Sequence, residues 1–294
     1  MSGLKEVRTR IASVKSTQQI TSAMKMVSAS KLKRAQNAII KIRPYVGKLT
    51  EILENLSASL DSDEGVYSKE RKVQKALVIV VTSNRGLCGA FNGNVIKSAV
   101  NMIHSKYPEI NKSGNLDIIC IGKKGSDFFV RRKYNVIENN AQILDSLSFE
   151  NVAPVAEKIM NNFTESKYDR VEVIYNQFKN AAMQILSTEQ FLPIKKTKPI
   201  SGKAKQTSDY IFEPNKAQII TELIPKSLKI QFYKMLLDSV AAEHGARMTA
   251  MHKATDNADN LLKELRLSYN KARQASITKE ILEIVSGANA QKAG

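Results

Sequence analysis

The residues whose types and spacing could do chemistry gather in a glycine turn at 83–93. The turn follows a run of apolar, mostly β-branched residues at 76–82 and precedes a helical pattern. A turn in this position can hold a phosphate with its backbone N–H groups. The stretch contains neither G-x-G-x-x-G nor G-x-x-x-x-G-K-[ST], and no acidic residue ends a second strand where a ribose would be bound. We interpret it as a structural turn, with nucleotide binding as the weaker alternative.

The other reactive side chains do not form a recognisable catalytic or metal-binding set. Cys88 lies in the turn with no histidine near it in sequence, and Cys120 lies within a predicted buried strand, so both are expected to be inert thiols. His244 and His252 are eight residues apart with no carboxylate at ligand spacing. We therefore predict no catalytic residue, no cofactor and no metal site, which favours a mechanical or binding role.

Composition indicates a soluble globular class and an anionic partner. The chain has 294 residues, is 43% hydrophobic and carries 45 Lys and Arg against 28 Asp and Glu, a net charge of +17. The partner could be nucleic acid, a membrane surface or an acidic protein. No signal peptide precedes the first periodic segment, and two cysteines make no disulfide framework, which favours a reducing compartment. Without a run of about 18 apolar residues, any link to a membrane is expected through other proteins or lipid headgroups.

Two long helices at the chain ends must position whatever the protein binds. The segment 226–286 has no proline and one glycine, and its apolar and small residues alternate in steps of 4 and 3, as in a coiled coil. That seam is Leu237, Ala241, His244, Met248, Met251, Thr255, Ala258, Leu262, Leu265, Tyr269, Ala272 and Ser276. Because few of these are large aliphatics, we expect a slender coiled coil.

The first helix repeats the pattern. Its seam is Leu4, Val7, Ile11, Val14, Gln18, Thr21, Lys25, Ser28, Leu32, Ala35, Ile39 and Ile42. Ile20, Met24 and Val27 form an apolar stripe on a neighbouring face, and residues 1–43 carry ten basic side chains against one acidic, Glu6. Pro44 is expected to kink or briefly interrupt the helix.

The middle of the chain predicts a small α/β domain with a parallel sheet. Strands are predicted at 76–82, 116–122 and 170–177, with an edge strand within 183–194. Helices are predicted after the glycine turn, at 126–133 and at 152–163, with a polar breaker at 61–65 and a solvated linker at 195–208. The predicted domains are 1–60, 73–195 and 209–294, and the two terminal helices are expected to pair antiparallel.

Two functional hypotheses follow from the residues. In the first, the protein is a structural subunit whose basic helices fit an acidic protein partner. In the second, the basic helical arm binds nucleic acid, although it lacks an aromatic stacking platform and a groove-reading module. A salt titration with duplex DNA separates them.

Four stretches point to the first hypothesis. Residues 20–27 (ITSAMKMV), 83–92 (SNRGLCGAFN), 247–258 (RMTAM to ATDNA) and 269–278 (YNKARQASIT) resemble the gamma subunit of F-type ATP synthase. The resemblance implies a non-catalytic central rotor shaft, present in one copy: an antiparallel coiled coil inside the alpha-beta hexamer. It also implies an inserted Rossmann-like α/β domain near the epsilon subunit and the membrane c-ring. Nucleic acid is not among the implied partners.

The resemblance also implies contact residues. Met24 and Lys25 are expected to face an acidic lever loop of the beta subunit, and Arg247, Gln274 and Thr278 to contact the loops that grip the shaft. No paired-cysteine insertion interrupts the middle domain, so no dithiol switch is expected. The implied location is peripheral, on the cytoplasmic face of a bacterial inner membrane, or on the matrix face for a mature organelle protein.

Overall fold

The computed structural model describes residues 2–57, 66–194 and 216–293, and the chain divides into two compact units. One unit comprises residues 1–28 and 248–294, and the other residues 29–247. The predicted breaker at 61–65 and linker at 195–208 lie outside the described residues. Helices α1 (Ser2–Ser57) and α6 (Lys216–Ala293) each contribute to both units.

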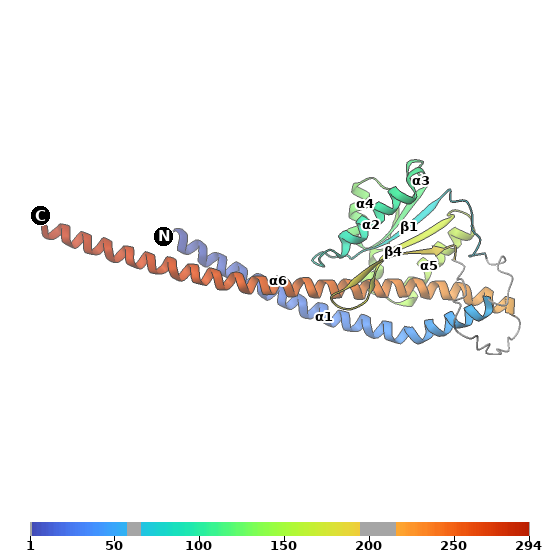
Figure 1. Cartoon of the computed structure of the whole chain (residues 1–294), viewed down its shortest axis with the longest axis horizontal. Coiled ribbons are helices and arrows are strands. Elements are labelled where there is room, and N and C mark those ends of the chain that lie inside the picture. Colours follow the sequence, from blue (N-terminus) through green and yellow to red (C-terminus); the bar gives the residue numbers. More distant parts are fainter. Residues whose placement is uncertain (1, 58–65, 195–215, 294) are drawn as a thin grey trace. The chain divides into compact units, whose positions relative to one another are not determined.

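In the first unit, α1 and α6 form an antiparallel pair (Figure 1). Three polar contacts join them: the Gln18 amide donates to Asp259, the Thr21 and Thr255 hydroxyls lie 2.9 Å apart, and Lys25 Nζ lies 3.4 Å from His252 Nδ1. Residue numbers rise along α1 as they fall along α6, which confirms the antiparallel pairing. The predicted seam is the buried side of the pair, with small and medium side chains that include Met251, Ala258, Leu262 and Leu265. In Figure 1, α6 continues past the start of α1.

The second unit contains a five-stranded sheet in the order β3-β2-β1-β4-β5. Four strands are parallel: β1 (Ala76–Val81), β2 (Leu116–Ile121), β3 (Val136–Asn139) and β4 (Arg170–Phe178). β5 (Gln184–Leu192) pairs antiparallel with β4 and is the predicted edge strand. Every residue of β1 is buried, as its continuous apolar run predicts. The prediction missed β3, because a strand of only four residues gives a weak sequence pattern.

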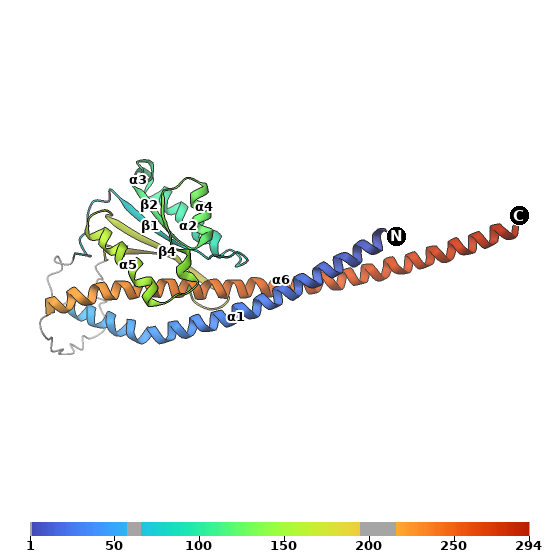
Figure 2. The ribbon, with the colours of Figure 1, turned by 180° about the vertical axis from the view of Figure 1, so that it is seen from behind.

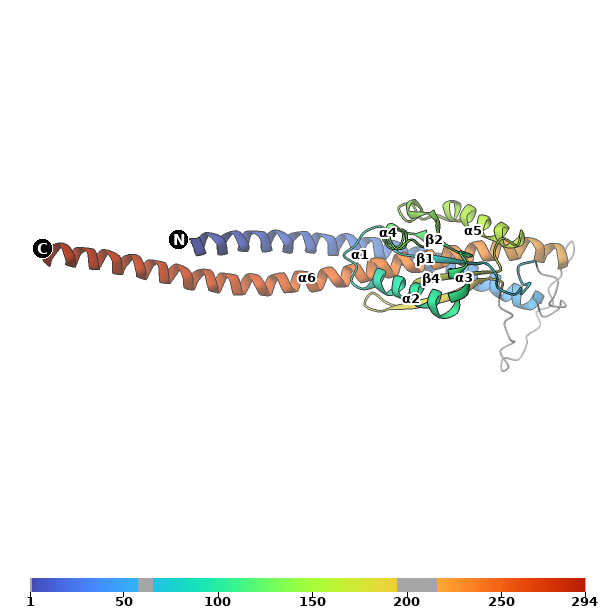
Figure 3. The same ribbon diagram turned by 90° about the horizontal axis from the view of Figure 1, so that it is seen from above.

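Helices cover both faces of the sheet (Figure 2). They are α2 (Phe91–Lys106), α3 (Pro108–Lys112), α4 (Lys123–Arg131) and α5 (Phe149–Thr164), with a 3-10 turn η1 (Ala141–Leu144). α2 and α5 lie on opposite sides of the sheet (Figure 3). The face under α2 and α4 buries Val78, Val95 and Phe129. The opposite face buries Ile79 and Phe163 together with Phe232 of α6, so the first part of α6 is also a layer of this domain.

Prolines do not bound the two long helices. Of the two outcomes expected at Pro44, an interruption is absent: α1 passes Pro44 and continues to Ser57, within the predicted helical segment 1–60. α6 begins at Lys216, before Pro225, earlier than the predicted proline-free segment 226–286. An interior proline removes one backbone hydrogen bond. Packing of buried side chains such as Ile39 and Leu49 on α1, and Leu228 on α6, accounts for the helices continuing through these positions. Among the described residues, no helix has both the length and the apolar character needed to cross a membrane.

Candidate functional site

The predicted contact residues fall into three places, and four of them belong to the coiled-coil unit. Met24 and Lys25 are half-buried on α1, next to side chains that face outward: Ile20 is 60% exposed and Val27 is 57% exposed. The predicted apolar stripe beside the seam is therefore on the surface of the pair. Lys25 itself reaches towards His252 of α6.

Gln274 and Thr278 lie farther along α6 and are both exposed. The Thr278 hydroxyl donates to the Gln274 backbone carbonyl at 3.0 Å, so the two residues are one helical turn apart on one side of the helix. Their side chains remain open to a partner. Whether they contact a beta subunit stays a prediction.

Arg247 differs, because it belongs to the second unit and is only 8% exposed. Its guanidinium donates to the backbone carbonyls of Arg85 (3.0 Å) and Gly86 (3.3 Å), both in the glycine turn. It also donates to Glu243 Oε1 at 2.6 Å and lies 3.4 Å from His244 Nδ1. Sequence reasoning did not find this contact, since nothing in either stretch pairs a turn carbonyl with an arginine some 160 residues later.

Burial shifts the pKa of both ionisable neighbours of Arg247, His244 and Glu243. It lowers the pKa of His244 to about 4, with the positive charges of Arg247 and Lys31 adding to the effect. His244 is therefore neutral at pH 7, and its Nδ1 can accept a hydrogen bond from Arg247. Burial raises the pKa of the Glu243 carboxyl, while Arg247 and Lys31 act in the opposite direction. Glu243 thus depends on Arg247 as its charge partner.

The glycine turn is held by its own side chains. The Asn92 carboxamide accepts from the Ser83 backbone N–H at 2.9 Å, and its amino group donates to the Ser83 hydroxyl at 2.8 Å and to Cys88 Sγ at 3.3 Å. The Ser83 hydroxyl donates to the Arg85 carbonyl at 2.6 Å. Asn84 connects the turn to the Ala141 carbonyl at 2.9 Å. These internal bonds support the structural interpretation of the turn.

The cysteines and potential metal ligands show no reactive arrangement. Both cysteines are free and buried, and burial raises the pKa of Cys120 to about 12. Within residues 2–57, 66–194 and 216–293, no three His, Cys, Asp or Glu side chains come together in a way that could hold a metal ion.

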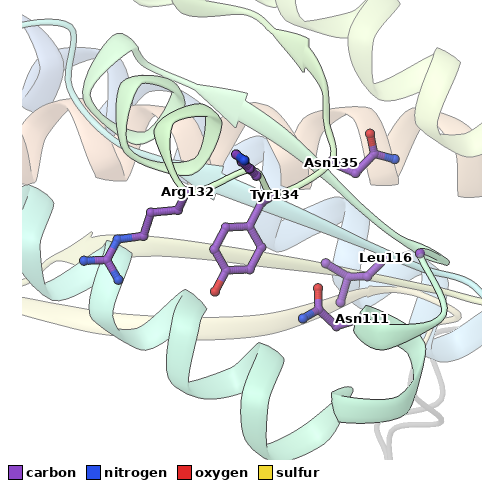
Figure 4. A pocket seen from close by; sticks show the side chains of 7 residues that line it. Asn111, Leu116, Arg132, Tyr134 and Asn135 are labelled. Atoms are coloured by element: carbon purple, nitrogen blue, oxygen red, sulfur yellow. The ribbon is translucent and has the colours of Figure 1, made fainter.

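A surface hollow of about 610 Å³ lies beside the first residue of β2 (Figure 4). Its lining includes Asn111, Leu116, Arg132 and Tyr134, and it contains no carboxylate. Leu116 begins β2, so the hollow lies at the amino ends of the parallel strands. Ligands of open α/β sheets bind at the carboxyl ends of the strands. The hollow is therefore a poor candidate for a nucleotide site.

Comparison with known proteins identifies the relatives of the chain. The sequence model of the family described as ATP synthase matches residues 3–291. The ATP synthase gamma chain of Flavobacterium psychrophilum is 57% identical over 296 residues, covering 99% of this chain and 100% of the relative. The ATP synthase gamma chain of Cytophaga hutchinsonii is 56% identical over 292 residues, covering 99% of each.

Solved structures share the fold. A chain of the Euglena gracilis mitochondrial ATP synthase, in a structure of OSCP, F1 and c-ring, matches with a TM-score of 0.68 at 20% identity. The match covers 100% of this chain and 96% of that one. A chain of the Tetrahymena thermophila mitochondrial ATP synthase, in a structure of the central stalk and c-ring, matches with a TM-score of 0.58 at 23% identity, covering 80% and 99%.

Proposed function

This chain belongs to the ATP synthase gamma chain family, and from that premise we propose that it is the central rotor shaft of an F-type ATP synthase. It turns inside the hexamer of alpha and beta subunits and couples ion-driven rotation of the membrane c-ring to ATP synthesis or hydrolysis. The observation that carries the proposal is the antiparallel pairing of α1 and α6 through a thin seam, with Gln274 and Thr278 exposed.

The last part of α6 supports enclosure by other subunits. Five large apolar side chains within nine residues are between 47% and 71% exposed: Ile277, Ile281, Leu282, Ile284 and Val285. A monomeric soluble protein rarely leaves a contiguous apolar group of this kind in water. Subunits that surround this end of the helix would bury it.

The charge distribution supports an acidic protein partner. Nine of the ten basic side chains on residues 1–43 are exposed, and Lys25 is half-buried. Basic side chains facing acidic loops attract and orient a partner without deep interlocking. Such contacts suit a subunit that must turn against its neighbours.

The contact residues follow from this role. Met24 and Lys25 face the acidic lever loop of a beta subunit, and Gln274 and Thr278 contact the loops that grip the shaft. The same role for Arg247 stays a prediction from the family resemblance. The chain itself holds no nucleotide and catalyses no step, because the catalytic sites belong to the beta subunits.

The remaining partners and the location follow from the family. One copy per complex joins the hexamer to the epsilon subunit and the c-ring. The protein is peripheral, on the cytoplasmic face of the inner membrane, as fits its bacterial relatives.

Reassembly tests the proposal. The purified chain should hydrolyse no ATP above background, and adding it to alpha and beta subunits of the same enzyme should raise their hydrolysis. Turnover by the chain alone that is lost on changing Arg85 or Lys123 would refute the shaft assignment. These two residues are chosen because each lies just beyond the carboxyl end of a parallel strand, β1 or β2, where a nucleotide site would be built.

A further inference from the structure

The glycine turn is joined to α6 by two kinds of contact, one apolar and one polar. Cys88 and Phe91 pack with Ala242 of α6 in a small buried cluster. Five residues farther along the helix, Arg247 donates from Nη2 to the Arg85 and Gly86 carbonyls and from Nε to the Gly86 carbonyl at 3.4 Å. A guanidinium suits this position, since its planar fork can serve two neighbouring acceptors at once.

The turn has a backbone that needs external support. Leu87 has φ 62°, in the left-handed region, and its side chain is 63% exposed. That conformation is unfavourable for a residue with a bulky side chain. Within the turn, the Ser83 hydroxyl also donates to the Arg85 carbonyl. The bonds from Arg247 add external support at the Arg85 and Gly86 carbonyls, immediately before Leu87.

We infer that Arg247 is a positioning residue that clamps the glycine turn at 83–93 to α6 through its hydrogen bonds. The clamp fixes the conformation in which Arg85 and Leu87 are presented on the surface and Cys88 is covered. Arg247 thus acts through the turn, whether or not it also meets another subunit. The inference concerns the chain by itself and does not rest on the proposed function.

The two cysteines provide a matched pair of probes. Cys88, 2% exposed, lies in the turn itself, whereas Cys120 lies in β2 and is 0% exposed. Opening of the turn alone would expose only Cys88. Opening of the sheet would expose both.

The experiment measures the rate at which a thiol reagent labels each cysteine in the full chain. In the wild type both rates should be slow. In Arg247→Gln the Cys88 rate should rise by about tenfold or more while the Cys120 rate stays unchanged. Arg247→Lys should give an intermediate rate, because one ammonium group cannot serve both carbonyls and Glu243 with the same geometry. Arg266→Gln, which removes an exposed arginine from the same helix, should change neither rate.

A second variant separates the clamp from the charge of Glu243. Removing Arg247 alone leaves the buried Glu243 carboxylate without its partner at 2.6 Å. In Arg247→Gln with Glu243→Gln this charge is absent, and the clamp inference predicts that Cys88 still labels fast. Restored protection of Cys88 in the double variant would overturn the inference. An unchanged Cys88 rate in Arg247→Gln, or equal increases for both cysteines, would also overturn it.

Discussion

Replacing Gly122 with alanine is expected to destabilise the α/β domain by more than about 4 kcal/mol. Gly122 has φ 116° and ψ 136°, a conformation that side-chain-bearing residues rarely adopt. A Cβ at this position would lie 2.2 Å from the Thr82 backbone oxygen. Because Thr82 directly follows β1 and Gly122 directly precedes α4, relief requires the sheet and α4 to separate.

The matched control is Gly114→Ala. Gly114 also has a positive φ, 73°, but an added Cβ would meet no atom within 4 Å. It should cost only the conformational penalty, about 1 to 2 kcal/mol. Chemical denaturation followed by circular dichroism measures both variants. Equal losses would show that the close approach of Gly122 to Thr82 does not matter.

A disulfide between positions 21 and 255 is expected to form within one chain and to leave ATP hydrolysis by the reassembled complex unchanged. The Thr21 and Thr255 hydroxyl oxygens lie 2.9 Å apart, so cysteines at these positions can meet. If the two helices turn together as one body, joining them removes no motion that the enzyme needs. In the chain-entropy model, such a long closed loop stabilises the fold by about 5.5 kcal/mol.

The control pair for this disulfide is Thr21→Cys with Lys253→Cys. Lys253 is exposed and lies two residues away on α6, about 200° around the helix. It should not crosslink to position 21, and the buried native cysteines should contribute little background. Crosslinks between chains only would indicate a homodimer. Loss of hydrolysis that returns on reduction would show that the helices move against each other.

The coiled coil and most of the sheet could be predicted because their patterns repeat. Alternating steps of 3 and 4 specify which side of each helix is buried, so the seam from Met251 to Leu265 was correct in detail. The strand β1 is a continuous apolar run, and such runs are buried on both faces. Neither inference needs knowledge of distant contacts.

The features that were missed depend on tertiary contacts. The start of α6 at Lys216 follows from packing on the sheet through Phe232 and its neighbours. Because a proline inside a helix is unfavourable, the local sequence alone predicts a helix that begins after Pro225. The contact of Arg247 with the glycine turn depends on two segments that are adjacent only in the folded chain. Of the predicted contact residues, Gln274 and Thr278 are exposed and Arg247 is buried, and their contacts with a beta subunit stay predictions.

Rotation of the chain inside the hexamer tests the central claim most directly. A visible probe can be attached through Ser105→Cys, an exposed position on α2, in a complex whose alpha and beta subunits are fixed to a surface. With ATP present, the probe should turn in one direction for many revolutions, and it should stop when ATP is removed. Continued ATP hydrolysis by complexes whose attached probe stays still would contradict the assignment of this chain as the rotor shaft.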